Sequence, residues 1–168
     1  NFGILYGISV FGLAQRLEIP RAEAKMLIDG YFAMFPKVKE YMDTAIEKGK
    51  KQEYVTTVFG RRRMLPGINS RNAVVRGFSE RNAINAPIQG TAADIIKIAM
   101  VNIFRRFKEE GLKSKMIMQV HDELIVECPE EIAPQVAQLV SSEMESIAAL
   151  SVPLTAEAKF GKSWYDAK

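Results

Sequence analysis

A long apolar stripe between Ile88 and Phe107 is the feature that most limits how this chain can fold. The stripe predicts one helix with a single buried face, ending near Gly111. Two segments, 115–120 and 123–128, follow it and are typical of strands joined by a tight turn. We therefore expect an antiparallel sheet backed by a long helix. The apolar positions at helical spacing are Ile88, Ala92, Ile95, Ile96, Ala99, Ile103 and Phe107.

Caps and breakers set the ends of the other expected helices. Gly3 and Gly7 are four residues apart and would share one face of a first helix, and Ser9 is a suitable N-cap for the next. Gly49 would close a later helix, and Pro87 would interrupt the helix that precedes the stripe.

Asn69 or Ser70 is the expected N-cap of the helix that the proline interrupts. Helices come first along the chain, and strands gather around two long helices near its end. This order predicts an α+β fold, with a helical lobe followed by an antiparallel sheet backed by long helices. The other expected elements are helices at 1–8, 9–17, 20–35, 38–49, 70–85 and 132–147, a hairpin at 53–66 and a last strand at 154–160.

The composition is that of a globular chain rather than a disordered one, with 48% apolar and 26% charged residues among 168. No stretch approaches the ~20 apolar residues of a membrane span. Cys128 is the single cysteine, which excludes an internal disulfide framework and a cysteine-rich zinc site and favours a reducing compartment. The chain begins at Asn1 without a methionine or a signal sequence, so we expect it to be a fragment of a longer protein.

Positive charge is concentrated between Arg61 and Arg81. This window holds six arginines and one acidic residue, Glu80, although the whole chain has a formal net charge of only +3. An arginine run is often solvated surface, but arginine also forms the better fork for phosphate. The charge pattern therefore leaves two interpretations open, a solvated face and a surface that binds nucleic acid or nucleotide phosphate.

The sequence His121-Asp122-Glu123 occupies the tight turn between the two expected strands. An aspartate in a turn often caps its own backbone, and a lone histidine is often only a surface residue. Two adjacent carboxylates at a sheet rim are, however, hard oxygen ligands suited to Mg²⁺ or Mn²⁺. The turn is thus a candidate divalent-metal site.

Three sequence strings occur in order along the chain: Asn1-Phe2-Gly3-Ile4-Leu5-Tyr6-Gly7, Asn85-Ala86-Pro87-Ile88-Gln89-Gly90-Thr91-Ala92-Ala93-Asp94 and Gln119-Val120-His121-Asp122-Glu123. With these strings the chain resembles the family A DNA polymerases, most closely the bacterial polymerase I group. The resemblance continues through Val152-Pro153-Leu154 and Gly161-Lys162-Ser163-Trp164 and so covers essentially the whole chain.

The resemblance implies an incomplete, hand-shaped polymerase. Residues 1–69 would form part of the fingers subdomain, and residues 70–168 would form the palm without the strand that carries the first metal aspartate. The implied reaction is attack of a primer 3′-hydroxyl on the α-phosphate of a dNTP, directed by a primer–template DNA. The implied cofactors are two Mg²⁺ ions, for which Mn²⁺ can substitute. The implied location is the bacterial cytoplasm, at the nucleoid and away from membranes.

The resemblance also implies a role for individual residues. Asp122 would be a catalytic metal ligand, Glu123 a supporting catalytic acid, and His121 a contact to the primer terminus. Phe2, Tyr6 and Gly7 would contact the incoming nucleotide and the template base, although Phe2 and Tyr6 are also spaced for simple core packing. The residues implied to bind DNA phosphates are Arg61, Arg62 and Arg71, and those implied to read the minor groove are Arg81, Asn85 and Gln89.

The chain departs from the family pattern at its beginning, because the family's finger-helix motif has an Arg and a Lys before the Asn that is Asn1 here. These triphosphate ligands, the first metal aspartate and the thumb lie outside the 168 residues. We therefore expect the fragment alone to be inactive and to self-associate through uncovered surface. Two alternatives are a non-catalytic DNA-binding remnant and a metal-dependent hydrolase built on His121, Asp122 and Glu123.

Overall fold

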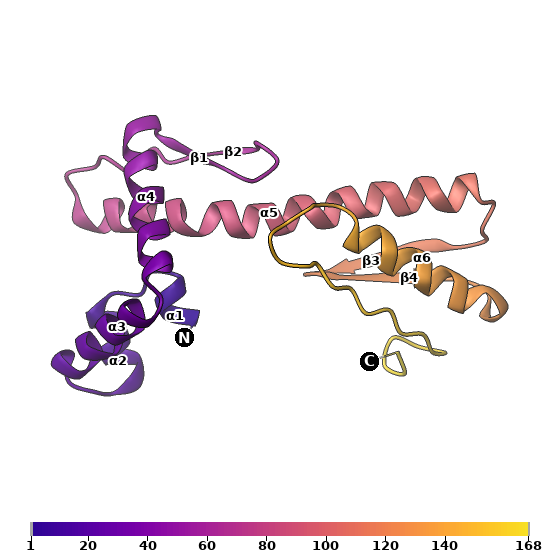
Figure 1. The fold of residues 1–168 in the computed structure, drawn as a ribbon, viewed down its shortest axis with the longest axis horizontal. Coiled ribbons are helices and arrows are strands. Elements are labelled where there is room, and N and C mark those ends of the chain that lie inside the picture. Colours follow the sequence, from indigo (N-terminus) through magenta and orange to yellow (C-terminus); the bar gives the residue numbers. More distant parts are fainter. Residues whose placement is uncertain (1, 168) are drawn as a thin grey trace. The chain divides into compact units, whose positions relative to one another are not determined.

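The computed structural model describes residues 2–167, which fall into two compact units. The first unit extends to Thr91 and the second begins at Ala92. One long helix, α5 (Ala73–Glu109), contributes its first half to the first unit and its second half to the second (Figure 1). Each unit has its own hydrophobic core.

The described residues form helices and two small antiparallel sheets, which confirms the predicted α+β class. The first unit contains α1 (Phe2–Leu5), α2 (Val10–Leu17), α3 (Arg21–Met34), α4 (Pro36–Gln52), β1 (Tyr54–Thr56), β2 (Arg62–Met64) and the start of α5. The second contains the rest of α5, β3 (Lys115–Val120), β4 (Glu123–Glu127), a 3₁₀ helix η1 (Glu130–Ile132) and α6 (Ala133–Glu145).

The first unit has two small cores. In one of them Leu13 and Ala14 of α2 pack against the fully buried Ala24 of α3. The start of α2 is as predicted, because the Ser9 hydroxyl accepts a hydrogen bond from Gly12 N at 3.0 Å. The other core joins the β1–β2 hairpin and the loop after it to α5, through Val55, Leu65, Ile68 and Ala83.

The second unit has one larger core that supports a β-hairpin. The second half of the apolar stripe is buried as predicted, whereas Ile88 in its first half is 57% exposed. The β3–β4 hairpin, at the predicted place, packs against this core with Met116, Leu124 and Val126. The buried core residues are Ala99, Ile103 and Phe107 of α5 and Val136, Leu139 and Val140 of α6.

Two predicted helix ends are wrong. The first helix ends at Leu5, and Gly7 follows with φ at +76°, so Gly3 and Gly7 do not share a helical face. This left-handed conformation costs glycine little because glycine has no Cβ. Helix α4 continues past Gly49 to Gln52, because Gly49 is buried within the helix and Glu53 adopts the left-handed conformation that ends it.

The predicted interruption at Pro87 is also wrong, because α5 runs continuously through it. A proline inside a helix removes one backbone hydrogen bond and usually kinks or breaks the helix. Here side chains bond to neighbouring carbonyls, with Thr91 Oγ1 donating to Pro87 O at 2.6 Å and Tyr41 Oη donating to Ile84 O at 2.8 Å. The helix tolerates the proline, although neither bond replaces the missing Pro87 N–H, which would have donated to the Ala83 carbonyl.

The cap of α5 and the last strand differ from the predictions as well. Asn72, rather than Asn69 or Ser70, caps α5, since its Oδ1 accepts from Val74 N at 2.9 Å. Residues 154–160 form no strand. This segment is fixed instead by side chains of α6, because Ala156 N donates to the Glu145 carboxylate at 2.9 Å.

The subdomain division at residues 69 and 70 stays a prediction. Across residues 2–167, no helix is both long enough and apolar enough to cross a lipid bilayer.

Candidate nucleic-acid interface

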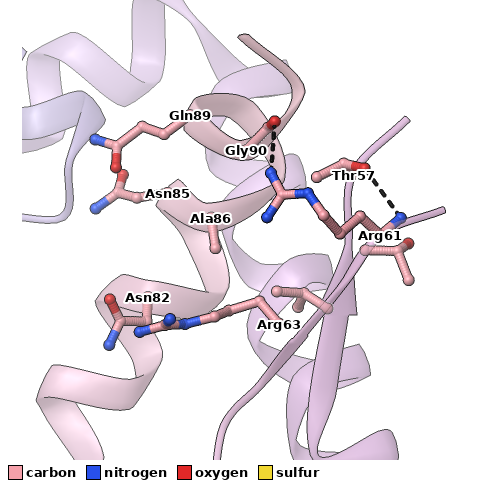
Figure 2. A pocket seen from close by; sticks show the side chains of 10 residues that line it. Thr57, Arg61, Arg63, Asn82, Asn85, Ala86, Gln89 and Gly90 are labelled. Atoms are coloured by element: carbon pink, nitrogen blue, oxygen red, sulfur yellow. Dashed lines mark hydrogen bonds between the residues drawn. The ribbon is translucent and has the colours of Figure 1, made fainter. Parts of the chain in front are cut away.

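The β1–β2 hairpin presents arginines on one short strand. Arg62 and Arg63 pair with Thr56 and Val55 in an antiparallel register, and both arginine side chains are exposed. The Arg62 guanidinium lies over the Tyr54 ring, with 4.8 Å between the guanidinium carbon and the ring centroid. This contact orients one arginine, whereas Arg63 extends toward α5 beside Asn82 (Figure 2).

The turn of this hairpin is docked onto α5 by hydrogen bonds. Val58 N donates to Thr91 Oγ1 at 3.0 Å, and Arg61 Nη2 donates to the Gly90 carbonyl at 2.9 Å (Figure 2). Inside the turn, Arg61 N donates to Thr57 Oγ1 at 3.1 Å. Both sides of the turn are therefore tied to the same stretch of helix.

A polar cavity of about 320 Å³ lies between the hairpin and α5. Two arginines and three amides converge on it, and it has no carboxylate among its lining residues. Such a lining suits an anionic ligand with several hydrogen-bonding groups, such as a nucleic-acid backbone with its bases. These arginine and amide side chains are those of Arg61, Arg63, Asn82, Asn85 and Gln89.

Asn85 also links α5 to the segment after α1. Its Nδ2 donates to the Tyr6 carbonyl at 3.4 Å, while its Oδ1 is buried and has no hydrogen-bond partner among the described residues. The Phe2 and Tyr6 rings stack with centroids 6.4 Å apart, and their exposed fractions are 74% and 44%. These aromatic rings are thus surface groups rather than the core packing that was the alternative.

Gly7 lies close to α5. A Cβ built on Gly7 would be 3.4 Å from both Arg81 Cγ and Ile84 Cδ1, and its φ of +76° is a second obstacle to a side chain. The Tyr41 hydroxyl donates to the backbone carbonyl of the same Ile84, and burial raises the pKa of Tyr41. The Tyr6–Gly7 segment therefore rests on a tightly packed part of α5.

The structure brings together only some of the arginines predicted to bind DNA. Arg61 lines the cavity with Asn85 and Gln89, whereas Arg62, Arg71 and Arg81 do not. Arg71 is exposed in the loop before α5, and its carbonyl accepts from Arg76 Nη1 at 3.5 Å.

The second unit presents the candidate metal ligands at the β3–β4 turn. His121, Asp122 and Glu123 are all exposed, and His121 has a positive φ of 54°. The His121 carbonyl accepts from Gln119 Nε2 at 2.5 Å, which fixes the turn. The Asp122 carboxylate has the hard oxygen donors that fit Mg²⁺. Among residues 2–167, however, no three His, Cys, Asp or Glu side chains are arranged so that they could hold one metal ion together.

Sequence reasoning did not identify the role of Asn82 or Thr57, which also line the cavity. Asn82 lies three residues before Asn85 and seven before Gln89, so it shares their face once the helix is continuous. Thr57 gave no comparable signal, because its contact with α5 is made across the fold.

The model of DNA polymerase family A matches residues 1–166. The chain belongs to DNA polymerase family A. It is 53% identical to DNA polymerase I of Geobacillus stearothermophilus and 50% identical to that of Bacillus subtilis, in both cases over all of its 168 residues. It covers 19% of the length of each of these family A relatives.

A solved family A structure has the same fold. It is the POL domain of Pol1 from M. smegmatis in complex with DNA primer-template and dNTP. The TM-score is 0.95 at 44% identity, over 99% of this chain and 29% of that one. The expected family is thereby confirmed from sequence and from structure.

Proposed function

We propose that this chain carries part of the DNA-binding and nucleotidyl-transfer machinery of a template-directed DNA polymerase. The observation that carries the proposal is the cationic, amide-lined cavity between the β1–β2 hairpin and α5. It is supported by the similar POL domain, whose structure contains a DNA primer-template and a dNTP. The reaction would join a primer 3′-hydroxyl oxygen to the α-phosphorus of a dNTP and release pyrophosphate.

The first unit would bind the duplex and the nucleotide. Arg61, Arg62 and Arg71 would contact phosphates, which fix the register of a duplex without reading its sequence. Arg81, Asn85 and Gln89 would contact the minor groove, where acceptors are alike for all base pairs, so that the shape of a pair is tested rather than its identity. Phe2, Tyr6 and Gly7 would contact the incoming nucleotide and the template base. The exposed rings of Phe2 and Tyr6 support this role.

The second unit would contribute a metal ligand. Asp122 would hold Mg²⁺ through its carboxylate, Glu123 would support it, and His121 would contact the primer terminus. Two bound Mg²⁺ ions would supply charge stabilisation and a lowered hydroxyl pKa. The position of Asp122 at a fixed turn between two paired strands supports its assignment, since a metal ligand requires a defined direction.

The 168 residues alone would not polymerise DNA. A two-metal site needs several carboxylates close together, and residues 2–167 contain no group of three His, Cys, Asp or Glu side chains that could hold a metal ion. Loss of even one group that stabilises a transition state costs about 2.7–4 kcal/mol, which lowers the rate by about 10²–10³-fold. Exposed apolar residues such as Val74 and Phe78 would favour self-association of the isolated chain.

The bacterial relatives support a place in the bacterial cytoplasm, at the nucleoid.

The test replaces Asp122 with alanine in the complete protein and measures Mg²⁺-dependent primer extension. The Asp122→Ala variant is expected to lose at least about 10²–10³-fold in extension rate, with DNA affinity nearly unchanged. Glu123→Ala is the matched control at the same turn, with the same change in charge and a smaller expected loss. If Asp122→Ala extended primers at the wild-type rate, the assignment of Asp122 as a metal ligand would be wrong. If the complete wild-type protein bound primer–template DNA without extending it, a non-catalytic DNA-binding protein would be the better description.

A further inference from the structure

Two buried threonines lie where the β1–β2 turn meets α5. Thr57 is 7% exposed and Thr91 is 9% exposed, and with Ser79 they make up the buried polar side chains among the described residues. A buried hydroxyl is stabilising only when its hydrogen-bonding capacity is used. The hydrogen bonds of these two hydroxyls therefore show which groups hold the turn against α5.

The Thr91 hydroxyl is used twice. It donates to the Pro87 carbonyl one turn earlier at 2.6 Å, and its oxygen accepts from Val58 N at 3.0 Å. The first bond fixes the direction of the hydroxyl, because a threonine in a helix can donate to the carbonyl one turn earlier. The second bond ties the hairpin turn to that hydroxyl. Val58 N thus depends on a single side-chain oxygen.

The approach between turn and helix is close. A Cβ on Gly90 would come within 2.7 Å of Thr57 Cγ2 and 3.3 Å of Arg61 Nη2, so the absence of a side chain at Gly90 permits the contact. The Arg61 guanidinium bonds to the Gly90 carbonyl on the same side. The Arg61 side chain therefore also holds the turn against α5.

We propose that Thr91 is a positioning residue that sets the distance between the β1–β2 hairpin and α5, and thereby the place of Arg63 opposite Asn82, Asn85 and Gln89. Thr91 itself does not line the cavity, whereas Arg63 and the three amides do. Figure 2 shows Arg63 reaching toward Asn82 from the strand that follows the docked turn. This inference rests on the proposed function, because the spacing is taken to match a DNA backbone and its minor groove.

The experiment measures primer–template affinity against salt concentration for variants of the complete protein. Thr91→Val keeps the shape of the side chain but removes the hydroxyl, and Thr91→Ser keeps the hydroxyl. Thr91→Val is expected to bind about tenfold more weakly because Val58 N loses its acceptor. The slope of log affinity against log salt concentration is expected to be smaller in magnitude by about one, as for the loss of one phosphate contact. Thr91→Ser is expected to resemble the wild type.

Arg63→Ala separates the inference from the proposed function. If Arg63→Ala leaves both affinity and salt dependence unchanged, the proposed DNA-binding cavity is wrong. If Arg63→Ala weakens binding while Thr91→Val behaves as wild type, or if Thr91→Ser is as weak as Thr91→Val, the positioning role alone is wrong. Adding Thr91→Val to Arg63→Ala is expected to change affinity little further, because residues that act through one contact are not additive.

Gly90→Ala provides a second route if Thr91→Val does not fold. Alanine favours a helix more than glycine does, so this variant is expected to remain folded. Its Cβ would push the turn away from α5 and is expected to reduce the salt dependence in the same way as Thr91→Val. Wild-type affinity and salt dependence in Gly90→Ala would overturn the positioning role.

Discussion

The two units support their candidate functional groups by different means. In the first unit, polar side chains on separate elements are fixed by hydrogen bonds across the fold, such as those from Val58 N to Thr91 and from Arg61 to Gly90. In the second unit, Asp122 lies at the end of a two-stranded ladder, and that ladder packs against an apolar core. The first candidate site is thus held by polar contacts in addition to a small apolar core under the hairpin, and the second is held by apolar packing behind its turn.

This difference follows from the proposed tasks. A surface that binds a long anionic polymer needs several groups at set spacings, and hydrogen bonds with defined geometry set such spacings. A single carboxylate at a turn needs only a rigid base. We therefore expect the first unit to be sensitive to the loss of single polar atoms and the second to be sensitive to the loss of core volume.

The largest expected effect comes from Ile103→Ala in the core of the second unit. Ile103 is fully buried between α5 and α6, so its truncation is expected to lower the free energy of local opening by about 2–5 kcal/mol. Amide hydrogen exchange of the complete protein would locate the loss to residues after Ala92. Ile117→Ala, at a 52% exposed position on β3, is the control and is expected to change little. An equal rise in exchange before Thr91 would contradict the separation of the two cores.

A smaller effect is expected from Asn72→Ala in the first unit. Removing the N-cap of α5 is expected to cost about 0.5–2 kcal/mol, seen as faster exchange of the Val74 and Val75 amides, which the Asn72 side chain accepts from. Asn69→Ala is the matched control, because the Asn69 amide bonds to the Lys50 carbonyl instead. Faster exchange at Val74 in the Asn69 variant alone would show that the cap was misassigned.

The N-cap of α5 shows what the sequence can and cannot predict. Asn69, Ser70 and Asn72 are all good N-caps, and only the fold determines which side chain reaches the free amides. Asn69 is engaged with α4, and Ser70 Oγ accepts from Asn72 N at 3.2 Å. Local chemistry therefore predicted that a cap would occur near this point, but tertiary contacts selected the residue.

The candidate sites divide in a similar way. The β3–β4 turn with Asp122 was predictable because both strands and the turn lie within one short segment. The cavity of the first unit was predictable only in part: the resemblance named Arg61, Asn85 and Gln89, whereas Arg63 and Asn82 join them only through packing of the hairpin against α5. A single-residue signal that is correct on average was wrong here, because α5 runs through Pro87 as one continuous helix, beside the hydrogen bonds of Thr91 and Tyr41 to neighbouring carbonyls.

The smallest effect tests one of these hydrogen bonds in the first unit. Tyr41→Phe removes the hydroxyl that donates to the Ile84 carbonyl and is expected to cost about 1 kcal/mol. Hydrogen exchange in the Pro87 segment of α5 would report the loss. Tyr165→Phe is the control, because Tyr165 is 87% exposed.

The pH dependence of that variant tests whether the Tyr41 hydroxyl is buried in the folded state. Burial raises the pKa of Tyr41 above its ordinary value of 10.0, so the folded state keeps the hydroxyl proton more tightly than the unfolded state. The stabilisation is therefore complete below about pH 10 and is lost as the pH rises through the folded-state value. Since phenylalanine does not titrate, Tyr41→Phe is expected to lose less stability than wild type above pH 10, so that the two converge. A constant difference between them at all pH values would mean that the Tyr41 hydroxyl has the same pKa in the folded and unfolded states, which would contradict its burial beside the Ile84 carbonyl.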